Sequence, residues 1–179
     1  MMPKYILFLF FFISLSGFSQ EFIQNDQESS ITFTIKNFGF DVDGNFSDFK
    51  IESNFNADAL AESFINAKIR VKSIFTDSEA RDEHLMKSDY FDVEKYPEIE
   101  FKSSEMEKNK DGNYLVKGPL IIKGTKKTIE TFLTIKEEEK SISILANFAI
   151  NRKDFGVGGS SFVLSKNVNI KMVYVANKN

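Results

Sequence analysis

The sequence predicts an all-β protein of about eight antiparallel strands, with one short helix between two of them. Two observations lead to this fold class. Apolar residues recur at every second position through most of the chain, which is the pattern of strands with one buried face. Turn-forming residues separate these segments, as in Asp111-Gly112-Asn113 and Lys123-Gly124-Thr125. The alternation alone is compatible with either a two-sheet sandwich or a closed barrel.

The chain of 179 residues is long enough for one domain with a core of its own. Residues 1–19 are predicted to be a secretory signal peptide. Lys4 precedes an unbroken apolar run at residues 6–13, and small residues occupy the −3 and −1 positions of a cut after Ser19. A transmembrane anchor is the alternative, but the run is shorter than the roughly 20 apolar residues that a span needs. We expect residues 20–179 to form a single exported domain, periplasmic or secreted.

The alternating segments follow one another along this domain. Their apolar positions are Ile31, Phe33 and Ile35; Ile65, Ala67, Ile69 and Val71; Ile99 and Phe101; Val116, Leu120 and Ile122; Ile129, Leu133 and Ile135; Ile142, Ile144, Phe148 and Ile150; and Val168, Ile170, Met172 and Tyr174. One segment changes phase between Phe46 and Phe49, so we expect a bulge or sharp bend near Asp48. Pro119 cannot donate a hydrogen bond to a neighbouring strand, which predicts an irregularity or a seam there.

A helix of about three turns is predicted after Asp77 or Ser78, either of which can cap its N-terminus. Acidic residues in the first turn suit the positive end of the helix dipole, and His84 lies near the other end, where a cation is favourable. His84 is the only histidine in the chain, and three charged residues at 81–83 precede it directly. This segment is either an acid–base site or the solvated side of a helix.

Composition and spacing argue against several classes of function. Loss of residues 1–19 removes one lysine and no acid, leaving 22 basic against 26 acidic residues. This acidic balance and the lack of a basic cluster argue against binding of nucleic acid. The chain has no cysteine, so thiol nucleophiles and zinc–thiolate sites are excluded. The serines at 160–161 lack the nucleophile-elbow pattern, and no pair of acids shares a predicted inward face. We therefore assign no catalytic residue, metal site or cofactor, and favour a packed helix around His84.

The segment at residues 73–101 resembles a motif of the YceI family. In that family a strand ending in Ser-Ile is followed by an Arg-Asp-x-His-Leu helix, a Phe-Asp pair and a Tyr-Pro-x-Ile-x-Phe strand. The residues that fit are Ser73, Ile74, Thr76, Arg81, Asp82, His84, Leu85, Phe91, Asp92, Tyr96, Pro97, Ile99 and Phe101. Blocks at residues 120–125 and 151–158 agree in order, whereas Tyr90 replaces a second phenylalanine that is usual in the family. The resemblance extends over about residues 30–176.

This resemblance implies a lipocalin-like, eight-stranded antiparallel β-barrel that holds a long isoprenoid or similar lipid in its lumen. The helix and the segment at residues 91–97 would close one end as a lid or plug. The strand phases and this closing segment then predict the lumen residues Phe33, Ile35, Phe46, Ile69, Val71, Phe91, Tyr96, Ile99, Phe101, Phe148 and Met172. Arg81, His84 and Arg152 are candidates for contact with a polar or phosphorylated head group, the alternative for the arginines being surface ion pairs.

Three functions remain open at this point. The chain is a carrier or storage protein for a polyisoprenoid or an isoprenoid quinone, a solid-core envelope protein that acts through its surface, or an isoprenoid-modifying or hydrolytic enzyme that uses His84 as a base. For the first function, the expected partners are the lipid itself and, transiently, a membrane. Dimerisation is left open. An empty or a filled lumen distinguishes the first function from the second.

Overall fold

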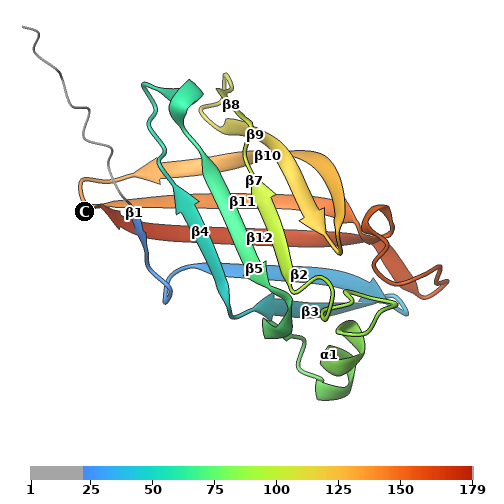
Figure 1. Ribbon diagram of the computed structural model, residues 1–179. Coiled ribbons are helices and arrows are strands. Elements are labelled where there is room, and N and C mark those ends of the chain that lie inside the picture. The colour runs from blue at the N-terminus through green and yellow to red at the C-terminus, as the bar shows by residue number, and fades with distance from the viewer. Residues whose placement is uncertain (1–21, 179) are drawn as a thin grey trace, which may run out of the picture.

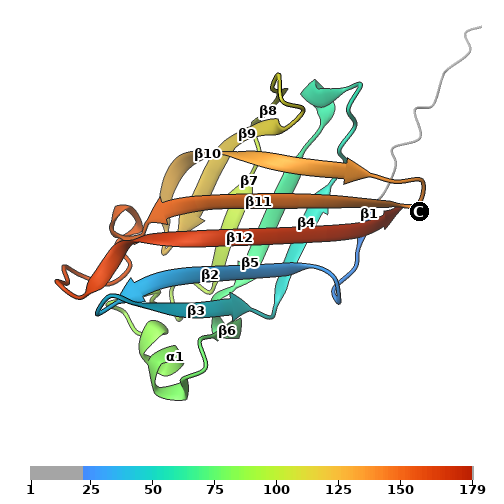
Figure 2. The ribbon, with the colours of Figure 1, turned by 180° about the vertical axis from the view of Figure 1, so that it is seen from behind.

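The computed structural model describes residues 22–178, and the predicted signal peptide at residues 1–19 lies outside this range. The described residues form twelve strands, one α-helix and three short 3₁₀ helices. All twelve strands belong to one strongly curled sheet, and α1 lies at one end of it (Figure 1). The same arrangement from behind shows β2, β3, β11 and β12 side by side (Figure 2).

Most of the elements along the chain are strands, and four short helices interrupt them. The strands are β1 (Phe22–Gln24), β2 (Ser30–Asn37), β3 (Phe40–Phe46), β4 (Phe49–Ser53), β5 (Ile65–Arg70), β6 (Ile74–Phe75), β7 (Glu98–Lys102), β8 (Glu105–Lys108), β9 (Tyr114–Ile122), β10 (Thr125–Glu137), β11 (Ser141–Asn151) and β12 (Leu164–Lys178). The helices are η1 (Leu60–Glu62), η2 (Val71–Ser73), α1 (Glu79–Leu85) and η3 (Arg152–Phe155).

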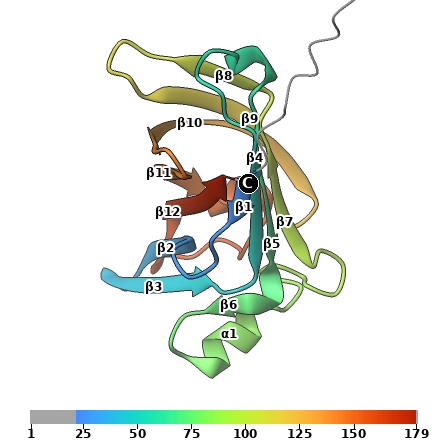
Figure 3. The same ribbon diagram turned by 90° about the vertical axis from the view of Figure 1, so that its left-hand side faces the viewer.

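A bent strand closes the sheet into a barrel. The strands pair antiparallel in the order β4-β5-β7-β9-β10-β11-β12-β2-β3-β6, and only Ser47 and Asp48 separate β3 from β4 along the chain. Because β3 pairs with β2 and β4 pairs with β5, the β3–β4 segment joins the two ends of the curled sheet (Figure 3). Counted with β3 and β4 as one strand, the principal strands number eight. The predicted antiparallel barrel and the bend near Asp48 are both confirmed.

The backbone at this bend is held by hydrogen bonds to the neighbouring segment. The N–H of Arg70 donates to the carbonyl of Asp48 at 2.9 Å, and the N–H of Ser47 donates to the carbonyl of Ser73 at 3.2 Å. A bend in a strand would otherwise leave its backbone groups without partners. The strand therefore changes direction, and changes the face that it buries, without losing its connection to the sheet.

The seam predicted at Pro119 is also confirmed. On one side β9 pairs with β8 through residues 114–117 and with β7 through residues 120–121, so the partner changes at Gly118 and Pro119. The missing donor of Pro119 thus falls where no ladder bond is required. Gly118 is needed at the same place, because a Cβ there would lie 2.1 Å from the backbone oxygen of Lys102.

The predicted hairpin turn is confirmed, whereas the helix is shorter than predicted. Ile122 pairs with Thr125 across a two-residue turn whose residues both have positive φ, the geometry of a type I′ hairpin. Helix α1 has seven residues, about two turns rather than three. It ends early because the chain reverses after Leu85, whose carbonyl accepts a hydrogen bond from the N–H of Phe91 at 3.1 Å. This reversal directs the segment after α1 back over the barrel.

The end of the barrel remote from α1 is a packed core. Its most deeply buried side chains are Ile142, Ile144, Tyr174 and Ala176. The rings of Phe55 and Tyr114 meet edge to face there, with centroids 4.9 Å apart. Fully buried aliphatic and aromatic side chains of this kind supply most of the hydrophobic stabilisation of a domain without disulfides. This half of the barrel therefore has the solid interior that a protein acting through its surface would have.

Tyr174 gives the core a specific dependence on alkaline pH. Its side chain is 0% exposed, and its hydroxyl has no hydrogen-bond partner among residues 22–178. Burial, with a smaller contribution from the charge of Glu52, raises the pKa of Tyr174 to about 12. The unfolded chain ionises this phenol near pH 10, so between pH 10 and 12 the unfolded state binds fewer protons than the folded state. The free energy of unfolding therefore falls with rising pH in that window.

We expect Tyr174→Phe to remove this part of the pH dependence. The contribution of Tyr174 amounts to a loss of about 2 kcal/mol by pH 12 and to almost nothing below pH 10. Urea unfolding of both proteins across this range measures it, since the other titrating groups are shared. Equal losses of stability in the two proteins would contradict the prediction.

Candidate functional site

The half of the barrel nearer α1 encloses a cavity of about 510 Å³. This volume lies within the range of about 300–1,000 Å³ that is usual for small-molecule sites. Strands from the whole circuit of the barrel contribute to its wall, together with α1 and the connection between β11 and β12. Most of the wall is aliphatic or aromatic, and its polar residues concentrate towards α1. The solid-core hypothesis therefore does not describe this half.

Nine of the eleven predicted lumen residues lie on the cavity wall. They are Phe33, Ile35, Phe46, Ile69, Phe91, Ile99, Phe101, Phe148 and Met172. Eight of them belong to strands and follow the inward phase of the alternation. Phe91 reaches the wall from the segment that reverses after α1. The rings of Phe33 and Phe46 are in contact across β2 and β3, with centroids 5.6 Å apart. Their contact with a lipid stays a prediction.

The two remaining predicted lumen residues, Val71 and Tyr96, lie elsewhere. Val71 begins η2, where the chain leaves the strand, and its side chain is buried in the core without reaching the cavity. The alternation was continued one residue too far at this position. The ring of Tyr96 lies against the β9–β10 turn, where a Cβ on Gly124 would come within 2.5 Å of it. Tyr96 thus packs against the turn of the β9–β10 hairpin and is not part of the cavity wall.

Other wall residues were missed by sequence reasoning. The connection between β11 and β12 contributes Phe155, Val157, Ser161 and Val163. An irregular connection has no periodicity, so the alternation gave no signal for these four. Strand residues such as Ile31, Ile150 and Ile170 are different, because they share the inward phase of Phe33, Phe148 and Met172 and could have been included.

Arg152 is buried at the α1 end of the cavity wall, with 4% of its surface exposed. Its guanidinium donates only to backbone carbonyls. The contacts are Nε to Ser165 at 2.8 Å; Nη1 to Val157, Gly158 and Gly159 at 2.7, 2.6 and 3.2 Å; and Nη2 to Leu164 at 3.3 Å. Within residues 22–178 it forms no ion pair, so the expected alternative of a surface pair does not apply. Arg152 fixes the shape of the β11–β12 connection and brings an uncompensated positive charge to the cavity.

Arg81 lies on the cavity wall at α1, and hydrogen bonds to Thr76 hold its guanidinium in place. Its Nε donates to the Thr76 hydroxyl at 2.7 Å, and its Nη2 donates to the Thr76 carbonyl. The same hydroxyl donates to the carboxylate of Asp82 at 2.5 Å. In the part of the chain that the structure describes, Arg81 forms no ion pair and its Nη1 makes no hydrogen bond. One edge of the guanidinium is therefore available to a ligand.

His84 lies at the outer edge of the cavity, and more than half of its side chain is exposed. Its Nε2 is 3.2 Å from a carboxylate oxygen of Asp89, and its ring meets Tyr90 edge to face at 5.0 Å. The hydrogen bond with His84 is the main reason why the pKa of Asp89 is lowered. No serine or threonine hydroxyl contacts the imidazole within the described range, so a hydrolytic triad is not assembled. Residues 22–178 also contain no group of three side chains that could hold a metal ion.

On one side of the α1 end of the barrel, hydrogen bonds join three connecting segments of the chain. The ammonium group of Lys123 donates to the carbonyls of Ser88 and Gly156, at 2.8 and 2.9 Å. The N–H of Gly158 donates to the carbonyl of Asp89 at 2.9 Å. These bonds join the β9–β10 turn, the segment after α1 and the β11–β12 connection. The exposed members of the cavity wall are Phe38, His84 and Val163, which places the mouth of the cavity between α1 and the tip of the β2–β3 hairpin.

A family model described as the YceI-like domain matches residues 23–176. The UPF0312 protein plu2095 of Photorhabdus laumondii is 36% identical over 104 residues, which are 58% of this chain and 54% of that protein. The chain thus spans about half the length of that relative.

Two solved structures share the fold. BcnA of Burkholderia cenocepacia has a TM-score of 0.82 at 23% identity, with 86% of this chain and 99% of that chain covered. A polyisoprenoid binding domain from Saccharophagus degradans has a TM-score of 0.70 at 14% identity, with 90% and 99% covered. At these identities both likenesses concern the fold alone.

Proposed function

This chain belongs to the YceI family, and from that premise we propose that it binds a long apolar lipid in its lumen as an exported carrier or storage protein. A polyisoprenoid or an isoprenoid quinone is the class that fits best. The observation that carries the proposal is the cavity of about 510 Å³ with its largely apolar wall. The fold shared with a polyisoprenoid binding domain of Saccharophagus degradans supports it.

The physical chemistry of an apolar wall favours a long guest over a small one. Capture of a ligand costs about 4–15 kcal/mol in lost translational and rotational freedom. Each buried methylene returns about 0.8 kcal/mol, so a five-carbon isoprene unit returns roughly 3–4 kcal/mol. Three or four buried units therefore offset a cost of about 10 kcal/mol. A short guest gains too little from contact with residues such as Phe33 and Phe101 to be retained.

The polar residues at the mouth suit a head group that carries negative or partly negative oxygen atoms. Arg81 has one edge of its guanidinium without a hydrogen bond among the described residues, and it faces the cavity. Arg152 adds positive charge, although carbonyls of the chain already occupy its donors. His84 lies at the outer edge, beside Asp89. We assign direct contact with a phosphate or a quinone carbonyl to Arg81, and electrostatic support to Arg152.

A binding function is favoured over catalysis by the position of the only imidazole. His84 is exposed at the edge of the mouth, and its hydrogen bond is with a carboxylate that is itself exposed. A general base must reach the proton that it removes, and a nucleophile or an activated water has to lie within about 3 Å of it. Within the described residues the hydrogen-bond partner of His84 is Asp89, so the imidazole activates no hydroxyl of the cavity wall. The function as an isoprenoid-modifying enzyme is therefore not part of the proposal.

Analysis of the bound lipid tests the proposal directly. Protein purified without detergent is examined by native mass spectrometry and by organic extraction, and we expect an isoprenoid chain to be released. After delipidation, a long isoprenoid alcohol should raise the melting temperature, whereas a short alcohol with the same head group should not. A lumen that yields no lipid, combined with no stabilisation by either alcohol, would refute the proposal.

Export to the periplasm or beyond the cell is proposed from residues 1–19. Its support is the short apolar run at residues 6–13, followed by small residues before Gln20. Separately, no helix in the range 22–178 is long and apolar enough to cross a membrane. N-terminal sequencing of the protein from cell fractions tests the cleavage. Met1 retained in a membrane pellet would rule it out.

A further inference from the structure

Four large apolar side chains are exposed together at the mouth of the cavity. They are Phe38, Phe40, Phe162 and Val163, and we call them the aromatic rim. Phe38 is 70% exposed, Phe40 is 77% exposed and Phe162 is fully exposed. The N–H of Phe38 donates to the carbonyl of Val163 at 2.9 Å, which joins the β2–β3 hairpin to the β11–β12 connection. The rim is therefore one surface built from two segments far apart in the sequence.

The conformation of Phe38 is unfavourable for a phenylalanine. Phe38 and Gly39 form the two-residue turn of the β2–β3 hairpin, with φ values of 51° and 83°. This type I′ geometry favours asparagine, aspartate or glycine at the first position, because a left-handed backbone brings Cβ close to the following carbonyl. The exposed ring obtains little packing within the chain in return. A strained, exposed aromatic residue at such a position points to a contact outside the protein.

The aromatic rim is continuous with the cavity. Phe38 and Val163 are exposed to solvent and also belong to the cavity wall. Leu164 and Val42, which adjoin the rim along β12 and β3, line the same wall. An apolar guest that leaves the lumen on this side meets apolar side chains all the way to the edge of the protein. Such a path avoids water only if the edge itself lies in an apolar phase.

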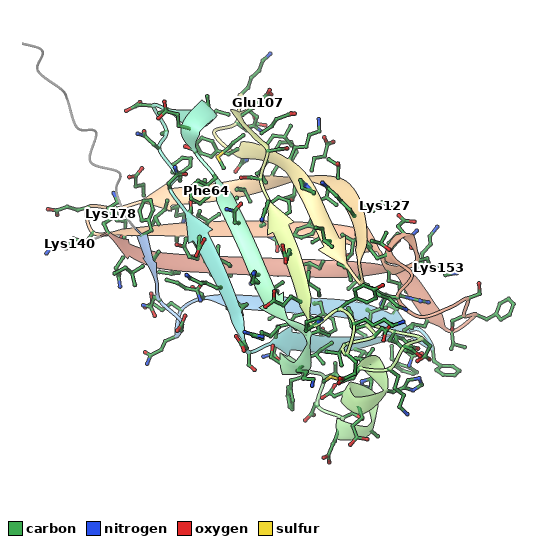
Figure 4. The ribbon with its side chains drawn as sticks, in the orientation of Figure 1. Phe64, Glu107, Lys127, Lys140, Lys153 and Lys178 are labelled. Atoms are coloured by element: carbon green, nitrogen blue, oxygen red, sulfur yellow. The ribbon has the colours of Figure 1, made fainter. Side chains whose placement is uncertain are left out.

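The charges around the rim suit the surface of a bilayer. Asp41, the acid nearest to the hairpin tip in the sequence, is paired with Lys36 at 2.8 Å. Lys153 lies in the β11–β12 connection and Lys166 near the start of β12, and neither has an acidic partner within the described range. Asp154, next to Lys153, accepts a hydrogen bond from the side chain of Asn151. Figure 4 shows Lys153 at this end of the molecule. Apolar anchors flanked by unpaired lysines are the combination that binds membranes containing anionic lipids.

We propose that the aromatic rim inserts into a phospholipid bilayer and opens the cavity mouth onto the acyl-chain layer. The rim is then the portal through which the lumen is loaded and emptied, a role that rests on the proposed function. Insertion itself is a property of the exposed side chains and is measured independently of any bound lipid. The bilayer is favoured over a protein acceptor because large apolar side chains of the rim are continuous with an apolar cavity and have lysines nearby.

A pair of rim substitutions tests the proposal without endangering the fold. Phe40→Thr alters a side chain that is 77% exposed at the start of β3 and lies outside the cavity wall, and threonine suits a strand. Phe162→Ser alters a side chain that is fully exposed. Phe132→Ser is the matched control, because Phe132 is 54% exposed in the middle of β10 and does not belong to the rim.

Binding is measured by co-flotation with vesicles of phosphatidylcholine that contain a minority of phosphatidylglycerol. We expect the wild type and Phe132→Ser to float with the vesicles. Affinity should fall at least about tenfold for Phe40→Thr/Phe162→Ser, since burial of one phenyl ring corresponds to a tenfold effect or more. Without vesicles, both variants should still be stabilised by the long isoprenoid alcohol, because Phe40, Phe162 and Phe132 do not belong to the cavity wall.

The outcomes separate this proposal from the proposed function. Vesicle binding that depends on the rim, in a protein whose lumen binds no isoprenoid, supports insertion and refutes the carrier function. A lumen that binds isoprenoid in a protein that does not float, or an equal loss in Phe132→Ser, overturns the insertion proposal. It is also overturned if sedimentation shows that the rim variants only dissociate a dimer, because the rim would then join two copies.

Discussion

Replacement of Arg152 by methionine is expected to lower the free energy of unfolding by about 3–5 kcal/mol. Methionine retains much of the apolar stem but none of the donors that satisfy the carbonyls of Val157, Gly158 and Ser165. A buried acceptor without a donor costs about 1–3 kcal/mol, and the losses are not additive because the connection can relax. The relaxed connection would also lose its place on the cavity wall.

Two further substitutions distinguish the role of the guanidinium from that of charge alone. Arg152→Lys keeps the charge, but an ammonium group cannot serve carbonyls on several sides as the planar fork does. We expect it to recover only part of the stability. Lys153→Met is the control at the adjacent exposed position and should change stability by less than about 0.5 kcal/mol. Equal urea midpoints for Arg152→Met and Lys153→Met would show that the carbonyl contacts contribute nothing.

The second large effect separates the packed half of the barrel from the half with the cavity. Ile144→Ala, in the packed half, should lower the free energy of unfolding by about 3–4 kcal/mol, because a buried cavity is left behind. Phe101→Ala should cost the lipid-free protein less than the roughly 3–5 kcal/mol typical of a packed phenylalanine. Part of the Phe101 ring already faces the cavity, so less contact is lost.

Added lipid should increase the loss of stability caused by Phe101→Ala relative to the loss caused by Ile144→Ala. A long isoprenoid alcohol should stabilise the wild type and Ile144→Ala by similar amounts, and Phe101→Ala by less, because stabilisation follows ligand affinity. Urea unfolding of delipidated protein, with and without the alcohol, measures both effects. A full core penalty for Phe101→Ala without lipid, and no stabilisation of the wild type by lipid, would leave a barrel with a purely structural interior.

The strands of the fold were predictable because burial on one face leaves a local pattern. The bend near Asp48 and the seam at Pro119 were predictable for the same reason, since each breaks a local rule of strand pairing. Strands β1 and β8 were missed, because three or four residues are too few to show an alternation. The length of α1 depends on the reversal that bonds Phe91 to Leu85, a tertiary contact that helix propensity does not contain.

The residues of the candidate site were likewise predictable where a local pattern exists and unpredictable where tertiary contacts decide their position. Strand residues such as Phe33 and Phe101 could be found from their phase, whereas Ser161 and Val163 lie in a connection whose conformation follows from the contacts of Arg152. Arg152 was selected as a head-group candidate, but its donors are largely occupied by the chain itself. The choice between sandwich and barrel also lay beyond the alternation. It is decided by the bent β3–β4 segment together with the pairing of β12 with β2, at opposite ends of the chain.

This last pairing also constrains how fast the chain can fold. The hydroxyl of Ser29 bonds to the carbonyl of Val175, a residue 146 positions later, and β1 pairs with the last residues of β12. Proteins dominated by such distant pairings fold in milliseconds to seconds, much more slowly than helical bundles. Until β12 is in place, β2 and β11 each present an unpaired edge to other chains. During synthesis the first strands must therefore wait for the last, and the chain benefits from protection against aggregation over that interval.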